Sequence, residues 1–437
     1  MSMAWTTGCV GLLLGLAVIP ARCDEPMPTP RELWERVAFP PVEYTVTRDE
    51  AMASYTDPRV QLRRVEVKFL SQIHHGVRMD HEAVIFIPAD PQVNAAAERR
   101  GKVVVVGQRL GDEPVVWNYG EPVAARTGYP TMVVSVPGAF DGEDGEGKWI
   151  YHTSDLGKQT QDPTDHNYFR LAACYLRALD VFAKVLGIEP KDLRAIIGGH
   201  SKRATSAYSA AAIDPQRIVG VVYMGNESTF EAMQADYRRP MSPLETQRYL
   251  QCPVLYIGAT NEDGYGMFAI NHIQSQMERP WTIEYIPNYR HASNSEKQFM
   301  DWQMWVAHVF DGRPLTTISD LSHEETAQGV RFRARIDSPN KLIMAKFWYT
   351  YCDDEPYWRD LVWYPTFGAR ALGDGYYESY ADGKTPDAWL VEVKDTAMGF
   401  PGYVSSLPQD ITHKATAVRK SRGSRSRQWE PKAERAQ

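Results

Sequence analysis

Residues 195–204 (AIIGGHSKRA) decide the fold and the chemistry expected of this chain. A short apolar run ends in two glycines, Ser201 follows, and a small-residue segment typical of a close-packed helix continues to Ile213. A serine on a sharp turn between a buried strand and a helix exposes its hydroxyl as a nucleophile, and such a turn needs small neighbours. Gly199 meets that need, although Arg203 stands where the common G-x-S-x-G pattern has its second glycine. The context therefore indicates a nucleophile elbow.

Outward from this stretch, apolar runs alternate with amphipathic ones over residues 42–313. The runs KVVVV and TMVVSV are apolar throughout, as are parallel strands buried on both faces. The pattern predicts strands at 65–70, 82–87, 102–106, 131–136, 193–197, 218–224, 253–257 and 282–286, helices at 121–127, 168–186, 202–213, 267–276 and 297–310, and a solvated loop at 138–147. This alternation predicts an α/β fold, a mostly parallel sheet with helices on both faces.

A serine nucleophile also needs a base, and an acid that orients the base. In α/β proteins with such an elbow, the acid follows one later strand and the histidine follows the next. The predicted strand that ends at residue 257 leads into a loop with two adjacent acids, and the strand that ends at residue 286 leads into the loop of His291. We therefore predict that Ser201 attacks a carbonyl carbon and that His291 takes its proton.

Two adjacent acids, Glu262 and Asp263, compete to orient His291. Neighbouring side chains point in different directions, so only one of them can reach the imidazole. Asp263 is the predicted acid because Gly264 lets the loop turn sharply there, and Glu262 is the alternative.

The oxyanion that forms on attack needs two hydrogen-bond donors. One is the backbone N–H of Lys202, directly after the nucleophile, and the other comes from the loop after the predicted strand 102–106. We predict the backbone N–H of Gln108 as this second donor.

Three motifs carry a more specific resemblance. The stretch 199–204 (GHSKRA), the acid loop 258–263 (GATNED) and the segment 287–291 (PNYRH) resemble the G-A-S-K-R-G, G-T-N-D and P-N-x-x-H patterns of the PhoPQ-activated pathogenicity-related family of α/β-hydrolases. The resemblance covers about residues 40–400 and implies an α/β-hydrolase fold and a serine hydrolase. Aspartate is the commoner acid in that family, whereas counting from the asparagine of the motif favours Glu262. Ala204 departs from the family's glycine.

A second, weaker resemblance is to glucuronoyl and acetyl esterases of plant polysaccharides, whose elbow reads G-C-S-R-x-G-K. We expect a carboxylic-ester hydrolase acting on a small-molecule or glycan ester through an acyl-enzyme. Glucuronoyl or acetyl esterase activity and peptidase or amidase activity remain alternatives, because one triad serves both esters and amides. A catalytically silent binding protein of the same fold is the alternative from another class.

The pattern changes after residue 313. Alternating or apolar runs at 330–336, 341–349 and 388–393 predict a small antiparallel β domain, sandwich-like, over residues 316–405. Its dense aromatic residues are predicted to be core, with a platform at the active-site mouth as the alternative. Because the connection is short, this domain is expected to pack against the catalytic domain of residues 42–313. Residues 406–437 are predicted to be a disordered basic tail.

At the N-terminus, the apolar run 9–19 has about half the length that a membrane-spanning helix needs. It predicts a signal peptide over residues 1–23, a linker over 24–41, and a secreted or periplasmic protein without a stable membrane span. The net charge is −7, and without the last 24 residues, which hold eight Lys or Arg and two acids, it is −13. Such an acidic body excludes a nucleic-acid binder.

No cofactor motif is present, and neither a cofactor nor a metal is expected. The adjacent His74 and His75 lack a spaced carboxylate or cysteine that would complete a metal site. Asp165 is predicted to cap the helix that follows it, and His200 to pack beside the nucleophile. Three cysteines remain after residue 23, so the chain is no disulfide scaffold.

Overall fold

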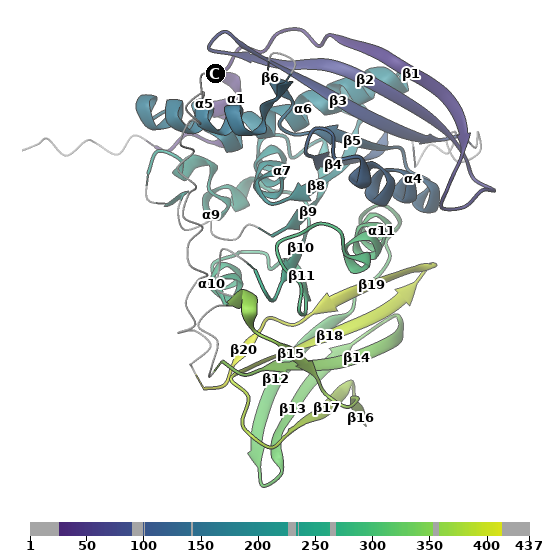
Figure 1. The fold of residues 1–437 in the computed structure, drawn as a ribbon, viewed down its shortest axis with the longest axis vertical. Coiled ribbons are helices and arrows are strands. Elements are labelled where there is room, and N and C mark those ends of the chain that lie inside the picture. Colours follow the sequence, from purple (N-terminus) through teal and green to yellow (C-terminus); the bar gives the residue numbers. More distant parts are fainter. Residues whose placement is uncertain are drawn as a thin grey trace, which may run out of the picture.

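The computed structural model describes residues 26–89, 99, 101–140, 143–225, 233–234, 236–262, 268–352 and 358–412. Within them, an eleven-stranded sheet forms the centre of the molecule (Figure 1). Its strands are β1 (Tyr44–Ala53), β2 (Gln61–His74), β3 (Val77–Pro88), β4 (Lys102–Gln108), β5 (Thr131–Ser135), β6 (Ala139–Phe140), β7 (Glu143–Asp144), β8 (Arg194–His200), β9 (Ile218–Met224), β10 (Val254–Ala259) and β11 (Thr282–Ile286). All eight predicted strands are present.

The strand order is β1-β2-β3-β5-β4-β8-β9-β10-β11. From β5 to β11 every neighbouring pair is parallel, whereas β1, β2, β3, β6 and β7 pair antiparallel at one side. The predicted fold class is confirmed, with a larger antiparallel part than expected. All parallel strands end at one edge of the sheet, where ligands and catalytic groups of open α/β sheets gather.

Helices cover both faces of the sheet. The longer ones are α1 (Pro30–Glu35), α4 (Glu121–Thr127), α5 (Gly145–Thr160), α6 (Asn167–Leu186), α7 (Lys202–Ile213), α10 (Ala269–Ser275) and α11 (Glu296–Asp311). Short turns of helix are α3 (Glu113–Val115), η1 (Val116–Gly120), η2 (Pro163–Asp165), η3 (Pro190–Asp192), η4 (Arg239–Met241), α9 (Pro243–Thr246), η5 (Gln247–Tyr249) and η6 (Trp358–Asp360). No described helix has both the length and the apolarity that a membrane crossing requires.

Alternation along β4 shows why two helical layers form. Val103 and Val105 pack into one core with α6 and α7, whereas Val104 and Val106 pack into a second core with α4 and α11. All four valines are buried. Because successive side chains of a strand face opposite sides, a strand apolar at every position needs cover on both faces.

The C-terminal part is a β sandwich, as predicted. One sheet has the order β12 (Thr317–Thr326), β13 (Gly329–Asp337), β17 (Tyr376–Asp382), β16 (Arg370–Gly373), and the other the order β15 (Trp363–Pro365), β14 (Lys341–Thr350), β18 (Ala388–Ala397), β19 (Phe400–Ser405), with β20 (Gln409–Asp410) beside β18. Between the sheets, the ring of Phe332 stacks on that of Trp389 at 4.9 Å, beside the buried Phe347. These three rings form the aromatic core of the sandwich, whereas most of the other described aromatic side chains of the β domain are half-buried or exposed. A second group, Tyr349, Tyr351 and Tyr364, clusters where the core ends.

The sandwich packs against the catalytic domain rather than standing free. In Figure 1 it lies below the central sheet, and β19 contacts both β11 and α11. The guanidinium of Arg313, buried at the connection, contacts the carboxylate of Asp395 on β18. The predicted docking of the β domain is confirmed.

Four details differ from the sequence-based expectation. Helix α1 lies in the predicted linker, because Thr29 supplies a capping box that starts a helix there. The predicted loop 138–147 contains β6, β7 and the start of α5, whose sequence lacks a clear apolar stripe. Strand β20 lies inside the predicted tail. The predicted signal peptide and residues 413–437 lie outside the described residues.

Candidate active site

The nucleophile elbow forms where β8 meets α7. Ser201 stands between the two elements with φ 62° and ψ −130°, a strained backbone conformation for a residue with a side chain. Its N–H donates a hydrogen bond to the carbonyl of Met224 at 2.8 Å, and its carbonyl accepts one from the N–H of Ala204 at 2.9 Å. The serine predicted as nucleophile thus has the sharp strand-to-helix turn of such an elbow.

Two glycines allow the elbow to pack closely against its neighbours. A Cβ on Gly198 would lie 2.3 Å from the carbonyl oxygen of Val222 on β9. A Cβ on Gly199 would lie 2.8 Å from both the Tyr175 hydroxyl and the Cβ of Arg203. The sequence analysis assigned this packing role to Gly199, and the structure adds Gly198.

An acid and a histidine meet at the same edge of the sheet. Residues 260–262 of the acid loop follow β10, and the histidine loop (residues 287–295) follows β11, its parallel neighbour. Nδ1 of His291 lies 2.9 Å from Oε1 and 3.1 Å from Oε2 of Glu262. Glu262 is buried, whereas His291 is partly exposed. The pair therefore has a buried acid behind an accessible imidazole, the order that a triad requires.

The observed partner of His291 is the acid that the sequence analysis gave as the alternative. Asp263, the acid predicted there, lies outside the described residues. Gly225, at the end of β9, packs against the pair: a Cβ there would lie 3.3 Å from Nδ1 of His291 and 3.6 Å from Oε2 of Glu262.

His200, which directly precedes Ser201, lies beside His291. Its ring centroid lies 4.2 Å from that of His291, at an interplanar angle of 42°. Burial, together with the nearby His291 and Arg203, lowers the pKa of His200 to about 3. The ring therefore stays uncharged near neutral pH and packs beside His291, in agreement with the packing role expected for it.

A small cavity of about 60 Å³ opens beside the elbow. It is lined by residues that include Gln108, Arg109, Tyr119, His200 and Met224. Gln108 ends β4, whose Gly107 pairs with Gly199 of β8, so the predicted donor from this strand stands next to the elbow. The buried Oε1 of Gln108 has no hydrogen-bond partner among the described residues. His200 and Arg203, on either side of Ser201 in the chain, line this cavity, whereas Ser201, Glu262 and His291 are not among its lining residues. The role of the Gln108 N–H stays a prediction.

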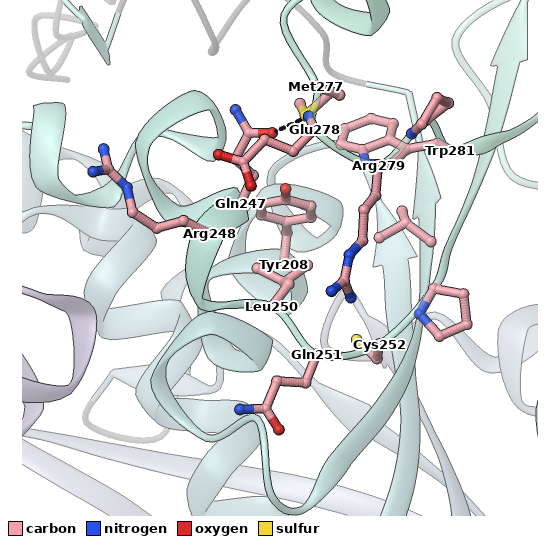
Figure 2. Close-up of a pocket in the computed structure, with 13 residues that line it drawn as sticks. Tyr208, Gln247, Arg248, Leu250, Gln251, Cys252, Met277, Glu278, Arg279 and Trp281 are labelled. Atoms are coloured by element: carbon pink, nitrogen blue, oxygen red, sulfur yellow. Dashed lines mark hydrogen bonds between the residues drawn. The ribbon is translucent and has the colours of Figure 1, made fainter.

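A larger pocket lies at the opposite ends of the strands. It has a volume of about 310 Å³, and Figure 2 shows Tyr208, Arg279 and Trp281 around it. Cys252, which also lines it, precedes β10, and Trp281 precedes β11. The pocket is thus at the amino ends of strands whose carboxyl ends carry the Glu262–His291 pair, and it is separate from the candidate site.

The structure brings together a cluster of two histidines and a carboxylate that the sequence analysis did not predict. Asp165 brings a carboxylate to His74 and His75, with its Oδ1 2.8 Å and 3.3 Å from their Nε2 atoms. Among the described residues, these three are the group whose potential metal-ligating atoms converge, all within 4.8 Å. The same oxygen lies 3.5 Å from the guanidinium of buried Arg170, so the carboxylate already neutralises a cation.

Two sequence-based statements about this cluster are therefore wrong. His74 and His75 do have a carboxylate partner, 91 and 90 residues away in the chain. Asp165 does not cap α6, because His166 is the cap residue and accepts a hydrogen bond from the N–H of Tyr168. Only the fold brings this loop to the end of β2, and no local spacing indicates it.

Part of the chain aligns with solved structures of esterases and related hydrolases. Acetyl xylan esterase 1 from a Thermoanaerobacterium species aligns with a TM-score of 0.44 and 11% identity, over 65% of this chain and 95% of that one. An S-formylglutathione hydrolase from Agrobacterium tumefaciens aligns with a TM-score of 0.39 and 12% identity, over 61% and 96%. A dienelactone hydrolase from Anabaena variabilis aligns with a TM-score of 0.36 and 14% identity, over 56% and 95%.

No protein-family model matches the chain, and no curated protein matches it significantly. The resemblance to the PhoPQ-activated family thus rests on the quoted motifs alone. At these identities and TM-scores, the likeness to solved structures carries no argument about substrate or catalytic residues.

Proposed function

We propose that this protein is a secreted serine hydrolase of carboxylic esters, with Ser201 as nucleophile, His291 as base and Glu262 as orienting acid. The observation that carries the proposal is the strained turn at Ser201 together with the Glu262–His291 contact two strands away. A backbone strained at a serine on an elbow is typical of a functional constraint. A carboxylate on Nδ1 leaves Nε2 of the same ring to exchange a proton with the serine.

The reaction follows from these roles. The Ser201 hydroxyl attacks the carbonyl carbon of the ester while His291 takes its proton, and Glu262 stabilises the imidazolium that forms. Backbone N–H groups of Lys202 and Gln108 would hold the oxyanion. His291 then returns the proton to the leaving alcohol, and water, activated by the same imidazole, releases the acid from the acyl-enzyme.

An ester of a small molecule or a glycan is the proposed substrate class. The motif resemblance to the PhoPQ-activated α/β-hydrolases supports the hydrolase, and the resemblance to glucuronoyl and acetyl esterases supports glycan esters among its substrates. The apolar run at residues 9–19 supports export. A panel of acetyl, feruloyl, glucuronoyl and peptide substrates separates esterase from amidase activity.

Labelling with a fluorophosphonate probe tests the proposal. We expect the folded protein to be labelled at Ser201, located by peptide mass spectrometry, and Ser201→Ala to take up no probe. His291→Gln, which keeps Ser201 but removes the base, should be labelled far more slowly. A folded wild-type protein that is not labelled would contradict the proposal and favour a catalytically silent binding protein. A Ser201→Ala variant that is still labelled would contradict the assignment of Ser201 as the nucleophile.

A further inference from the structure

The acid loop and the histidine loop are joined to each other beside the catalytic pair. The N–H of Asn261 donates to the carbonyl of Tyr289 at 3.0 Å, and the N–H of Asn288 donates to Oγ1 of Thr260 at 2.9 Å. Asn261 directly precedes the acid, and Asn288 lies three residues before the histidine. Whatever holds these two asparagines therefore holds both catalytic groups.

Both asparagine side chains are bound by the β domain, at the segment 358–365 that we call the clamp segment. Nδ2 of Asn261 donates to the carbonyls of Leu361 at 2.5 Å and Arg359 at 3.2 Å. Asn288 makes a pair of bonds with one backbone residue: its Nδ2 donates to the carbonyl of Trp363 at 2.8 Å, and its Oδ1 accepts from the N–H of Trp363 at 2.7 Å.

The clamp segment is itself firmly anchored. Trp363 pairs with Thr350 of β14, and the Thr350 hydroxyl donates to the carbonyl of Val362 at 2.8 Å. Leu361 and Trp363 are buried and belong to the same apolar core as α6 and α7 of the catalytic domain. Two buried side chains and a sheet-paired end therefore anchor this segment, which can act as a support for the loops that it binds.

The chemistry of the contacts requires an amide at both positions. Each asparagine donates to carbonyl oxygens through nitrogen, and each oxygen accepts from an N–H or a hydroxyl. A carboxylate would face a carbonyl oxygen, and an alanine would leave buried backbone groups without partners, which costs free energy.

We propose that the β domain completes the catalytic machinery, and that Asn261 and Asn288 are positioning residues through which the clamp segment fixes the distance between Glu262 and His291. The proposal rests on the proposed function for its effect on catalysis. Its geometric part stands independently, because the clamp fixes the acid–histidine contact whether or not the protein turns over a substrate.

The first test reads the contact directly. In the full-length protein, the hydrogen-bonded Nδ1 proton of His291 should give a downfield ¹H NMR resonance, assigned by its loss in His291→Gln. We expect Asn261→Ala and Asn288→Ala to weaken or abolish this resonance. Asn288→Asp, which replaces the amide NH₂ group by an oxygen at nearly the same size, should do the same. Asn271→Ala is the matched control, since Nδ2 of Asn271 on α10 donates to the carbonyl of Pro408 at 2.8 Å, between the same two parts of the molecule but away from both catalytic loops.

The second test uses hydrolysis of p-nitrophenyl acetate by the same variants. In the variants of Asn261 and Asn288 we expect kcat to fall on the order of 10²-fold with KM little changed, because a small misplacement of a catalytic group lowers the rate of the chemical step. Asn271→Ala should have the kcat of the wild type. If the variants of Asn261 and Asn288 show the same resonance and the same kcat as Asn271→Ala, the positioning proposal is overturned. The proposal that the protein is a serine hydrolase is not affected by that result. A lost kcat with the resonance retained would also overturn the positioning proposal. A wild type without activity would refute the proposed function, while the resonance still tests the clamp.

Discussion

The carboxylate of Glu262 lies 2.9 Å from Nδ1 of His291, across the carboxyl ends of the adjacent parallel strands β10 and β11. An acid after one strand and a histidine after the next can meet in this way because parallel neighbours end at the same edge. Ser201 follows β8 at the same edge, and the ring of the preceding His200 lies beside that of His291.

The first prediction concerns the identity of the acid. Glu262→Gln keeps the size of the side chain but removes the charge that stabilises the imidazolium, so kcat for p-nitrophenyl acetate should fall by about 10³- to 10⁴-fold. Asp263→Ala should retain most of the activity. Melting temperatures close to the wild type would show that both variants fold. If Asp263→Ala loses most of its kcat and Glu262→Gln keeps it, Asp263 is the orienting acid.

The second prediction concerns the packing of the elbow. In Gly198→Ala the new methyl group meets a backbone carbonyl of β9 that cannot move aside, so the free energy of unfolding should drop by about 3 kcal/mol or more. Gly220→Ala, on β9 itself, is the graded control, because its Cβ meets side-chain atoms instead, of Val309 at 3.1 Å and of Ile196 at 3.2 Å. Urea denaturation of both variants measures the difference. Equal destabilisation would contradict the argument.

The sequence predicts the parallel part of the sheet well and the rest poorly, for a physical reason. Strands buried on both faces carry an uninterrupted apolar run, such as the four valines of β4, and stand out from their surroundings. The edge strand β1 pairs only with β2 and leaves most of its side chains exposed, so its sequence carries no such pattern. Helix α5 likewise has no apolar stripe that local periodicity would reveal.

The candidate site divides in the same way. Ser201 and His291 follow strands that sequence patterns predict, and their order along the chain is informative. The choice between adjacent acids depends on which way each side chain leaves the loop, which composition does not encode. The contacts of Asn261 and Asn288 with the β domain join residues about 75 to 100 positions apart, and no short motif signals them.

The third prediction concerns the buried cluster at the end of β2. Asp165→Asn leaves the guanidinium of Arg170 buried without its neutralising carboxylate, and breaking such a pair costs about 3–5 kcal/mol. His75→Ala, which removes an exposed partner of the same oxygen, should cost far less. Thermal denaturation of both variants is the measurement. An Asp165→Asn protein as stable as His75→Ala would show that the carboxylate is not needed to balance Arg170.

The fourth prediction concerns the pH dependence of stability. Burial raises the pKa of Asp301 on α11 to about 8, and its Oδ1 accepts a hydrogen bond from the N–H of Tyr403 at 2.7 Å. The folded state therefore holds a proton that the unfolded chain releases near its ordinary pKa, so stability falls as the pH rises through the interval from about 4 to about 8. Burial also raises the pKa of Glu284 well above its usual range, which adds to the same slope.

Asp301→Asn keeps the acceptor for Tyr403 and removes the titration. Its unfolding free energy should depend less steeply on pH between 5 and 8, by at most about 1.4 kcal/mol per pH unit for one proton. Urea denaturation at several pH values compares the variant with the wild type. Parallel curves for the two proteins would show that Asp301 is ionised in the folded state throughout this range.

The last prediction concerns the dependence of the catalytic domain on the sandwich. A fragment of residues 24–313 would expose the buried side chain of Arg313, which loses the carboxylate of Asp395, and the apolar surface of α11 and β11 that β19 covers. We expect it to be insoluble or to melt far below the full-length protein, since a single buried ion pair that loses one partner costs about 3–5 kcal/mol before any apolar area is counted. A chain of residues 24–412 is the control, because it lacks only residues 1–23 and 413–437 and should melt like the full-length protein. Soluble expression and differential scanning calorimetry make the comparison.

A soluble 24–313 fragment with an unchanged melting temperature would show that the two parts are independent. It would at the same time remove the physical basis for a clamp acting on the acid and histidine loops.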